Sequence, residues 1–215
     1  MHLQAHAGLG WLIGASAPGA DRRLRNWCVA AAVLPDVDGV TYLFGPEAFG
    51  RWHHTVGHNV FAGVLCVLAA AWHVRGNRLY AGFLTAIAFL SHLVTDQVFT
   101  EWPVYPLWPF SYHPLPLDNR YALGHPINTW IVIGSLVIIP LIALWRKVTP
   151  LDVLSPSLDR AVINTFRAKT LACATCAAPC GNRCEKCEAP LCGRHARIDR
   201  RLRLVCSACG RPPAS

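Results

Sequence analysis

LYAGFLTAIAFLSHLVTDQV, residues 79–98, carries two metal-binding residue types inside a stretch long enough to cross a membrane. A helix of about 20 mostly apolar residues spans the roughly 30 Å of hydrocarbon in a bilayer. His92 and Asp96 lie four residues apart, so a helix places both on one face, where an imidazole nitrogen and a carboxylate oxygen can bind one divalent ion. Ionisable side chains within such segments usually mark a functional site.

Two further stretches, Val56 to Val74 and Ile127 to Trp145, are also apolar enough to span. Gly8 to Ala17 and Trp27 to Leu34 are too short to span alone, and are typical of half-buried or re-entrant helices. The composition is also typical of a membrane protein, because 53% of the residues are apolar and only 15% are charged. The sequence therefore predicts an all-α integral membrane helical bundle.

Basic residues indicate an orientation, because they gather in alternate loops: Arg22, Arg23 and Arg25, then Arg75 and Arg78, then Arg146 and Lys147. Loops rich in lysine and arginine stay in the cytoplasm. If each of the two short N-terminal segments crosses, nearly every metal-type ligand falls on the opposite face. No basic region precedes the first apolar stretch, so we expect insertion into the inner membrane through several uncleaved segments.

Candidate ligands occur in three further places along the chain. Asp36 and Asp38 follow an apolar run and Pro35, which predicts a helix that ends in a turn holding two carboxylates, and like charges there need a cation. His6 lies early in the chain, and His53, His54 and His58 precede the first long span. Taken singly, His92 and Asp96 could form a structural hydrogen bond, and Asp36 and Asp38 could cap a turn. Their convergence on one face favours a metal site.

These motifs, in this order, resemble the YdjM-like membrane-bound metal-dependent hydrolases over residues 1–145. That family has an early histidine, then L-P-D-[IV]-D, H-R-G-x-T-H-S and S-H-x-x-x-D, which correspond here to His6, Leu34–Asp38, His53–Asn59 and Ser91–Asp96. His53 and His58 take the two histidines of the third motif. His54 replaces its arginine, Thr55 its glycine, Gly57 its threonine and Asn59 its serine.

The resemblance implies a hydrolase that holds one or two divalent ions, expected to be zinc, which lower the pKa of a bound water and polarise the scissile bond. Its metal ligands would be His6, Asp36, Asp38, His53, His58, His92 and Asp96. Asp36 or Asp38 would act as the general base. A site at the membrane face favours a lipid or phosphoester substrate, and membrane lipids are the expected surroundings.

Eight of the ten cysteines lie between Cys173 and Cys209, in a tail that follows a boundary near residue 150 and a polar linker, residues 151–170. In residues 171–211, four pairs share one spacing: Cys173 with Cys176, Cys184 with Cys187, Cys192 with His195, and Cys206 with Cys209. A two-residue spacer directs both side chains of a pair at one ion, so eight ligands predict two closed structural zinc sites. Disulfides are disfavoured in a cytoplasmic tail.

The spacers between the pairs resemble those of a B-box or another cross-brace finger, in which pairs one and three hold one ion and pairs two and four the other. Cys180 is a ninth candidate ligand. So short a domain has little apolar core, hence metal should supply most of its stability. Its many arginines could form a solvated positive face or contact an acidic partner, and cross-brace fingers more often recruit proteins than catalyse.

The favoured function is therefore a membrane-bound metal-dependent hydrolase with a cytoplasmic zinc finger that binds a protein partner. The alternative is a non-enzymatic membrane scaffold or metal-binding protein that recruits partners through its finger. A transporter would spread its ligands through the depth of the membrane, whereas these gather at one end of the spans. Nucleic-acid binding is not favoured, because no aromatic residue follows Phe166.

Overall fold

The computed structural model describes residues 2–116, 121–122, 124–164, 166, 171–199 and 201–209. The chain divides into two compact units, Met1–Ile142 and Ala143–Ser215. Among the described residues the first unit is helical, and the second combines helices with three two-stranded antiparallel hairpins. The fold is thus mostly helical with a small, cysteine-rich C-terminal region of short strands, which confirms the predicted fold class.

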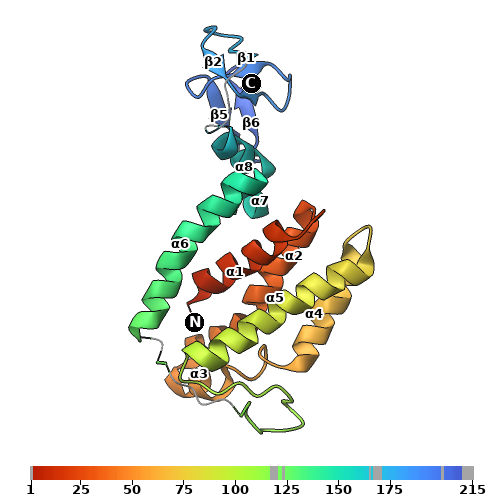
Figure 1. Ribbon diagram of the computed structural model, residues 1–215, viewed down its shortest axis with the longest axis vertical. Helices are drawn as coiled ribbons and strands as arrows, with labels where there is room; N and C mark the ends of the chain where they lie inside the picture. Colours follow the sequence, from red (N-terminus) through yellow and green to blue (C-terminus); the bar gives the residue numbers. More distant parts are fainter. Residues whose placement is uncertain are drawn as a thin grey trace. The chain divides into compact units, whose positions relative to one another are not determined.

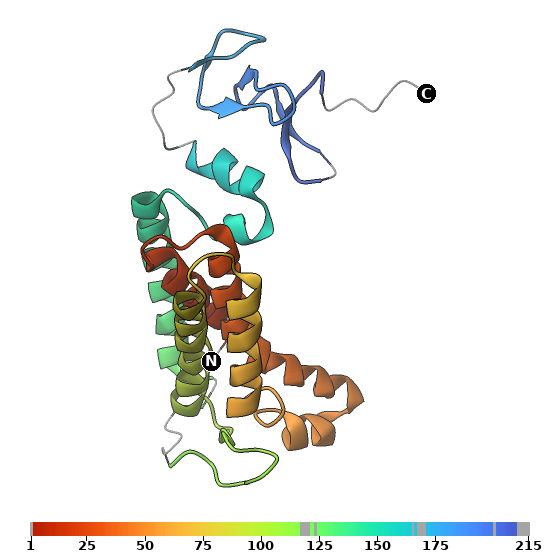
Figure 2. The same ribbon diagram turned by 90° about the vertical axis from the view of Figure 1, so that its right-hand side faces the viewer.

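Antiparallel helices build the first unit (Figures 1 and 2). α1 packs against α2, α2 against α5, and α5 against α4, while the 3₁₀ helix η1 continues α2 and packs against the short α3. The helices of the chain up to residue 146 are α1 (Leu3–Ser16), α2 (Arg22–Val33), η1 (Leu34–Phe44), α3 (Pro46–Trp52), α4 (Val60–His73), α5 (Arg78–Phe99) and α6 (Pro126–Arg146).

Small residues allow the first two helices to pack closely. A Cβ atom added to Gly10 of α1 would lie 2.6 Å from the Cβ atom of Ala32, and one added to Gly14 would lie 2.9 Å from the Cα atom of Arg25. The core beside them contains further small side chains, including Ala31 and Ala88, both fully buried. Helices in membranes associate through such small residues, because the apolar medium provides no hydrophobic force between them.

Three helical stretches are long and apolar enough to cross a membrane: Arg22–Phe44, Arg78–Phe99 and Pro126–Arg146. The last two coincide with predicted spans. The first corrects the expectation for residues 27–34, because η1 extends α2 instead of breaking into a turn. Pro35 permits this, since the first turn of a helix needs no hydrogen bond from the missing N–H.

The predicted span of residues 56–74 is shorter in the structure. α4 has 14 residues and begins only at Val60, because the Asn59 side chain accepts a hydrogen bond from the Ala62 N–H at 2.9 Å and caps the helix. Residues before Asn59 belong instead to a loop that carries the histidines. This loop, residues 53–59, is called the histidine loop below.

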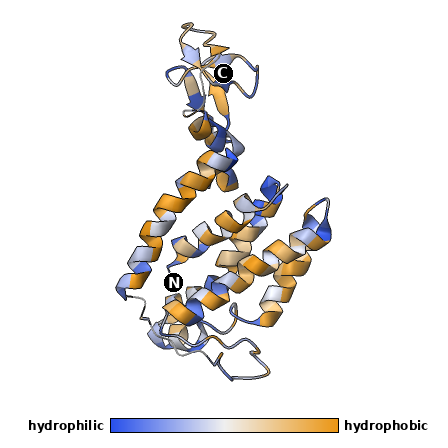
Figure 3. Cartoon of the chain, in the orientation of Figure 1, coloured by the Kyte–Doolittle hydropathy of each residue, from blue (hydrophilic) through white to orange (hydrophobic). Residues whose placement is uncertain are grey.

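The two ends of the first unit differ in chemistry. Tyr80 of α5 donates a hydrogen bond to the Pro18 carbonyl oxygen at 3.0 Å, which joins the α1–α2 loop to the start of α5. The starts of α2 and α5, which carry the basic residues Arg22 and Arg78, therefore lie at the same end (Figure 1). The beginning of α1, the histidine loop and the end of α5 lie at the other end. The helices between these ends consist mostly of hydrophobic residues (Figure 3). Many of their large apolar side chains are exposed, as expected of a surface that faces lipid.

In the second unit each hairpin is short. β1 (Leu171–Ala172) pairs with β2 (Pro179–Cys180), β3 (Asn182–Arg183) with β4 (Pro190–Leu191), and β5 (Ala196–Ile198) with β6 (Leu204–Cys206). The residues expected to form a linker contain two helices, α7 (Leu151–Leu154) and α8 (Pro156–Ile163). These contact the hairpins, since Ser155 Oγ donates to the Leu202 carbonyl oxygen and Arg160 pairs with Glu185, both at 2.8 Å.

Candidate metal centre

Four side chains meet at one end of the first unit: Asp36 from η1, His58 from the histidine loop, and His92 and Asp96 from α5. One ligand atom of each lies within 4.8 Å of the others. His92 Nε2 is 3.0 Å from both His58 Nε2 and Asp96 Oδ2, and 3.7 Å from Asp36 Oδ1. Bonds of about 2.0–2.1 Å to tetrahedral zinc would put neighbouring ligand atoms about 3.3 Å apart. The four side chains, called the His/Asp centre below, fit one divalent ion.

The second ring nitrogen of each of these histidines contacts an acceptor. His92 Nδ1 lies 2.7 Å from the Ala32 carbonyl oxygen, and His58 Nδ1 lies 3.0 Å from Asp38 Oδ2. Because both oxygens accept, each Nδ1 carries the hydrogen, and in a neutral ring Nε2 then turns its lone pair toward the centre. Buried lone pairs and carboxylate oxygens at such distances need a cation between them. The donor set therefore suits a metal ion.

Asp38 lies behind the His/Asp centre. Its Oδ1 atom is 2.8 Å from His53 Nδ1, and its Oδ2 atom accepts from His58 Nδ1 and, at 3.2 Å, from the Gly57 N–H. The Asp38 side chain is 1% exposed, whereas that of Asp36 is 18% exposed. The structure thus brings the predicted ligands Asp38 and His53 beside the centre, but not into the group of four whose ligand atoms converge.

His6 and His54 contact Asp96 as well. His6 Nε2 is 2.9 Å from Asp96 Oδ1, and its ring stacks on His92 with 3.8 Å between centroids. His54 Nε2 is 3.4 Å from Asp96 Oδ2, and His54 Nδ1 is 3.1 Å from the Trp102 carbonyl oxygen. His6 was predicted as a ligand. His54 was a candidate from its place in the run of histidines, but the ligand set that the resemblance implies leaves it out, because it stands at the arginine position of the third motif.

Close packing fixes the histidine loop against η1. A Cβ atom on Gly57 would overlap the Pro35 carbonyl oxygen, so only glycine allows the loop to approach this closely. The Asn59 side chain donates to the carbonyl oxygens of Thr55 and Val56 at 2.9 and 2.7 Å. The departures from the family motif at Gly57 and Asn59 therefore have structural roles in this chain.

The centre favours positive charge. Burial is the largest influence on both His54 and His58, and it acts to lower their pKa values. For His54 burial prevails and lowers the pKa to about 2. For His58 the hydrogen bonds to Asp38 and Asp96 outweigh burial and raise the pKa to about 9. A proton on His58 or a metal ion can supply the charge that the carboxylates require.

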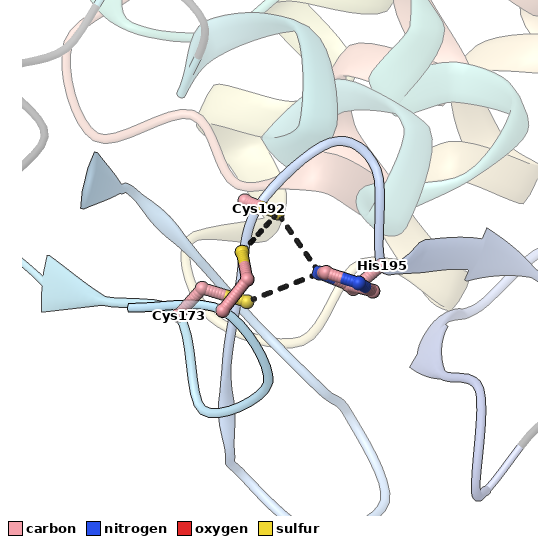
Figure 4. Close-up of side chains that lie close together, drawn as sticks. Cys173, Cys192 and His195 are labelled. Atoms are coloured by element: carbon pink, nitrogen blue, oxygen red, sulfur yellow. Dashed lines mark hydrogen bonds between the residues drawn. The ribbon is translucent and has the colours of Figure 1, made fainter. Parts of the chain in front are cut away.

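Cysteine and histidine side chains form a separate group in the second unit. Cys176 Sγ and Cys192 Sγ lie 3.6 Å apart, and His195 Nδ1 lies 3.3 Å from Cys192 Sγ and 3.6 Å from Cys173 Sγ. Figure 4 shows Cys173, Cys192 and His195 directed at one another. Zinc–sulfur bonds of about 2.3 Å would put two sulfurs about 3.8 Å apart. The four side chains could hold one ion.

Cys184, Cys187, Cys206 and Cys209 form the second group of the finger, with 3.8 Å between the sulfurs of Cys187 and Cys206. Pairs one and three thus meet at one site and pairs two and four at the other, which is the cross-brace grouping that the resemblance implies. Cys180 is buried and lies outside both groups.

Backbone donors prepare both cysteine groups for metal. Hydrogen bonds from the N–H groups of Cys192 and Thr175 lower the pKa of Cys173 to about 5. Burial acts to raise the pKa of Cys184, but the N–H groups of Cys206 and Cys187 outweigh it and lower this pKa to about 6. Each site therefore holds a thiolate at neutral pH, the form that binds metal.

In a comparison with known families, residues 1–176 match the YdjM inner membrane protein family. Comparison with curated proteins and with solved structures gives no match. The family match covers all of the residues of the His/Asp centre and the first cysteine pair of the finger. Together with three helices able to cross a membrane, it confirms the resemblance seen in the sequence. The chain belongs to the YdjM inner membrane protein family.

Proposed function

We propose that the chain is a membrane-bound metal-dependent hydrolase whose active site is the His/Asp centre. The observation that carries this proposal is the meeting of two imidazole nitrogens and two carboxylates on one point, with one of the carboxylates open to water. Closed structural sites use four protein ligands and exclude water, whereas catalytic sites keep a position for water or substrate. Asp36, whose side chain is 18% exposed, offers such a position.

Each residue of the centre has a distinct task in this proposal. A divalent ion, expected to be zinc, would supply Lewis acidity and an acidified water. His58, His92 and Asp96 hold the ion, and Asp38 keeps His58 in the tautomer that presents Nε2. Asp36, the carboxylate nearest solvent, accepts the proton of the attacking water as general base.

An apolar groove beside the centre supports an amphiphilic substrate. The groove has a volume of about 610 Å³ and is lined mainly by apolar side chains of α2, η1 and α4, among them Leu34, Leu65 and Ala69, and by Asp38. A lipid chain in the groove would place its ester or phosphoester near the ion. The substrate class that best fits is a lipid with a phosphoester or carboxylic ester headgroup.

Hydrolysis assays on the detergent-purified full chain test this proposal. We expect metal-dependent turnover of a long-chain phosphoester or ester in mixed micelles, and its loss in His92→Ala and Asp36→Asn. His113→Ala is the matched control, because His113 is exposed in a loop. If the wild-type chain carries its ion at the centre and yet hydrolyses no phosphoester or ester, the proposal is wrong and the non-enzymatic alternative replaces it.

The orientation is part of the same proposal. The basic residues at the α1–α2 loop and at the start of α5 occupy one end of the first unit, and the His/Asp centre occupies the other. The positive-inside rule then puts the centre on the side of the inner membrane opposite the cytoplasm. Reporter fusions after residue 76 and after residue 110 test this. Cytoplasmic reporter activity after residue 110 would mean that the His/Asp centre faces the cytoplasm, opposite to the proposed orientation.

The finger completes the proposal as a cytoplasmic zinc-binding module that recruits a protein partner. Its exposed basic side chains suit an acidic surface: Arg183, Lys186, Arg194, Arg197 and Arg201. Arg203 is less suited to bind an acidic partner, because its guanidinium group already donates two hydrogen bonds to Asp199 Oδ2. Arg200, another basic residue of the finger sequence, lies outside the described residues. Crosslinking in cells, with Arg194→Glu and Arg197→Glu as variants, tests for a partner that depends on these charges.

A further inference from the structure

His54 is a buried residue of the histidine loop with no task so far. Its side chain is 1% exposed, although the backbone must adopt the left-handed conformation, with φ of 65°, to place it there. Histidine tolerates that conformation better than bulky or branched residues, but an extended conformation costs less. A strained residue with a fully buried polar ring indicates that the surrounding structure requires the ring in that place.

The hydrogen bond at one nitrogen decides what the other can do. His54 Nδ1 lies 3.1 Å from the carbonyl oxygen of Trp102, which can only accept, so Nδ1 carries the hydrogen. In a neutral ring Nε2 is then bare, and it points at Asp96 Oδ2, 3.4 Å away. A lone pair does not approach a carboxylate oxygen in a buried place unless a cation lies between them.

His54 repeats the arrangement of the two histidines already in the His/Asp centre. Its ring stacks on that of His58, with 4.2 Å between centroids and an interplanar angle of 26°. The Nε2 atoms of His54 and His58 both lie 3.4 Å from Asp96 Oδ2, and that of His92 lies 3.0 Å from it. Each of the three has its Nδ1 atom bound to an acceptor: Trp102, Asp38 or Ala32.

We infer that His54 is a third imidazole ligand of the ion at the His/Asp centre. This chain thereby has a neutral nitrogen donor at the position where the third family motif has arginine. Three imidazoles and a carboxylate form a nitrogen-rich set, which favours zinc over magnesium or manganese, because the latter two prefer oxygen ligands. The inference rests on the proposed metal centre, but it does not require that the centre hydrolyse anything.

Manganese is the probe for this inference for two reasons. Mn²⁺ is paramagnetic, so its resonance spectrum reports the nitrogen atoms bonded to it. Thiolate sites bind Mn²⁺ weakly, so the finger does not compete for it. Zinc is first removed from the centre with a weak chelator, while the finger retains its zinc, and the full chain is then titrated with Mn²⁺. Free Mn²⁺ is measured by its electron paramagnetic resonance signal, and bonded imidazole nitrogens are measured by pulsed resonance. In the wild type we expect one bound Mn²⁺ with the signature of three imidazoles.

His54→Gln and His54→Arg separate a ligand from a simple charge partner of Asp96. If His54 is a ligand, both variants lose one imidazole coupling and bind Mn²⁺ at least about tenfold more weakly. A loss of about tenfold is the smallest expected when a residue that supports a metal ligand is replaced. If His54 only forms an ion pair, His54→Arg keeps the affinity and both variants keep the wild-type nitrogen signal, which overturns the inference. His113→Gln, in an exposed loop, controls for the loss of an imidazole.

The outcomes also separate this inference from the proposed function. If the wild type binds no Mn²⁺ or Zn²⁺ outside the finger, the metal centre itself is wrong and His54 has no ion to bind. If the wild type binds the ion and His54→Gln binds it equally well with the same nitrogen signal, only the role of His54 is wrong. The result that supports the role is a lost nitrogen coupling together with weaker binding.

Discussion

The His/Asp centre and the finger are both built from metal-ligand side chains, but they differ in how the chain assembles them. The finger takes its ligands from pairs only two residues apart, all between Cys173 and Cys209. The centre takes its ligands from Asp36, His58 and the end of α5, which the helices of the first unit must bring together. We therefore expect the finger to need metal in order to fold, and the centre to need the fold in order to bind metal.

The two regions also differ in the ligand atoms they offer. Each finger site has four thiolate or imidazole ligands and no carboxylate, which is typical of a closed structural zinc site. The centre mixes imidazoles with carboxylates, and one of these, Asp36, is partly exposed. Of these described groups, the centre is therefore the one whose donor set and access to water suit the proposed hydrolase.

The largest effect is expected from breaking a finger site. Structural zinc contributes about 10–16 kcal/mol to small zinc-binding domains, far more than their apolar cores. Cys184→Ser should therefore unfold the finger, which limited proteolysis of the full chain would detect as rapid cleavage after residue 170. Cys180→Ser is the matched control, because Cys180 is equally buried but belongs to neither group. Equal protease resistance of both variants would contradict the dependence on metal.

The next effect is the loss of the ion at the centre without loss of fold. His92 is fully buried, and its Nε2 atom lies within 3.7 Å of a ligand atom of each of the three other members of the centre. Loss of a residue that only orients a ligand weakens metal binding by up to about 100-fold, so His92→Ala should weaken Mn²⁺ binding by more than that. Helix content by circular dichroism should stay unchanged, because α5 keeps its packing against α2 and α4. A variant that loses its helices together with its ion would show that the centre is structural like the finger.

Substitutions of Asp38 and Asp36 should have smaller effects, which differ in how activity responds to added metal. Asp38→Asn disturbs the orientation of His58, so metal affinity should fall by about 10–100-fold and activity should recover when more metal is added. Asp36→Asn removes the proposed base, so activity should stay low even when metal binding is saturated. Hydrolysis measured as a function of metal concentration distinguishes the two. Recovery of Asp36→Asn at high metal would make Asp36 a mere ligand.

The smallest effect is expected in the groove. Ala69→Trp fills part of the apolar groove without touching the centre, so turnover of a long-chain substrate should fall several-fold through a higher KM, while that of a short soluble analogue and Mn²⁺ affinity remain unchanged. Leu68→Trp, on the same helix, exposed and outside the groove lining, is the control. Equal loss for both substrates would mean that the groove does not bind the lipid chain.

The sequence predicted the features that follow from local pattern. The apolar length of residues 79–98 and 127–145 predicted two of the membrane helices, and the pair spacing of the cysteines predicted which residues could converge in the finger. Such features depend on periodicity within a few turns of chain. The motif order was sufficient to identify the family, because each motif kept most of its ligand residues.

Features that depend on long-range packing were not predictable in this way. The extension of α2 by η1 depends on where Pro35 falls in a helical turn, and the late start of α4 depends on the Asn59 cap. The division of labour between Asp36 and Asp38 depends on which way each side chain turns once the histidine loop packs against η1. His54 was a candidate but was left out of the implied ligand set, because a motif position defined by arginine gives no reason to expect a metal ligand there.

The number of metal ions per chain tests the central claim most directly. Elemental analysis of the detergent-purified full chain, compared with its His92→Ala variant, requires no knowledge of the substrate. Three groups of ligands predict three ions per wild-type chain, two in the finger and one in the His/Asp centre, and two ions in the variant. Two ions in both proteins, after incubation with zinc and with manganese, would contradict a metal centre in the membrane.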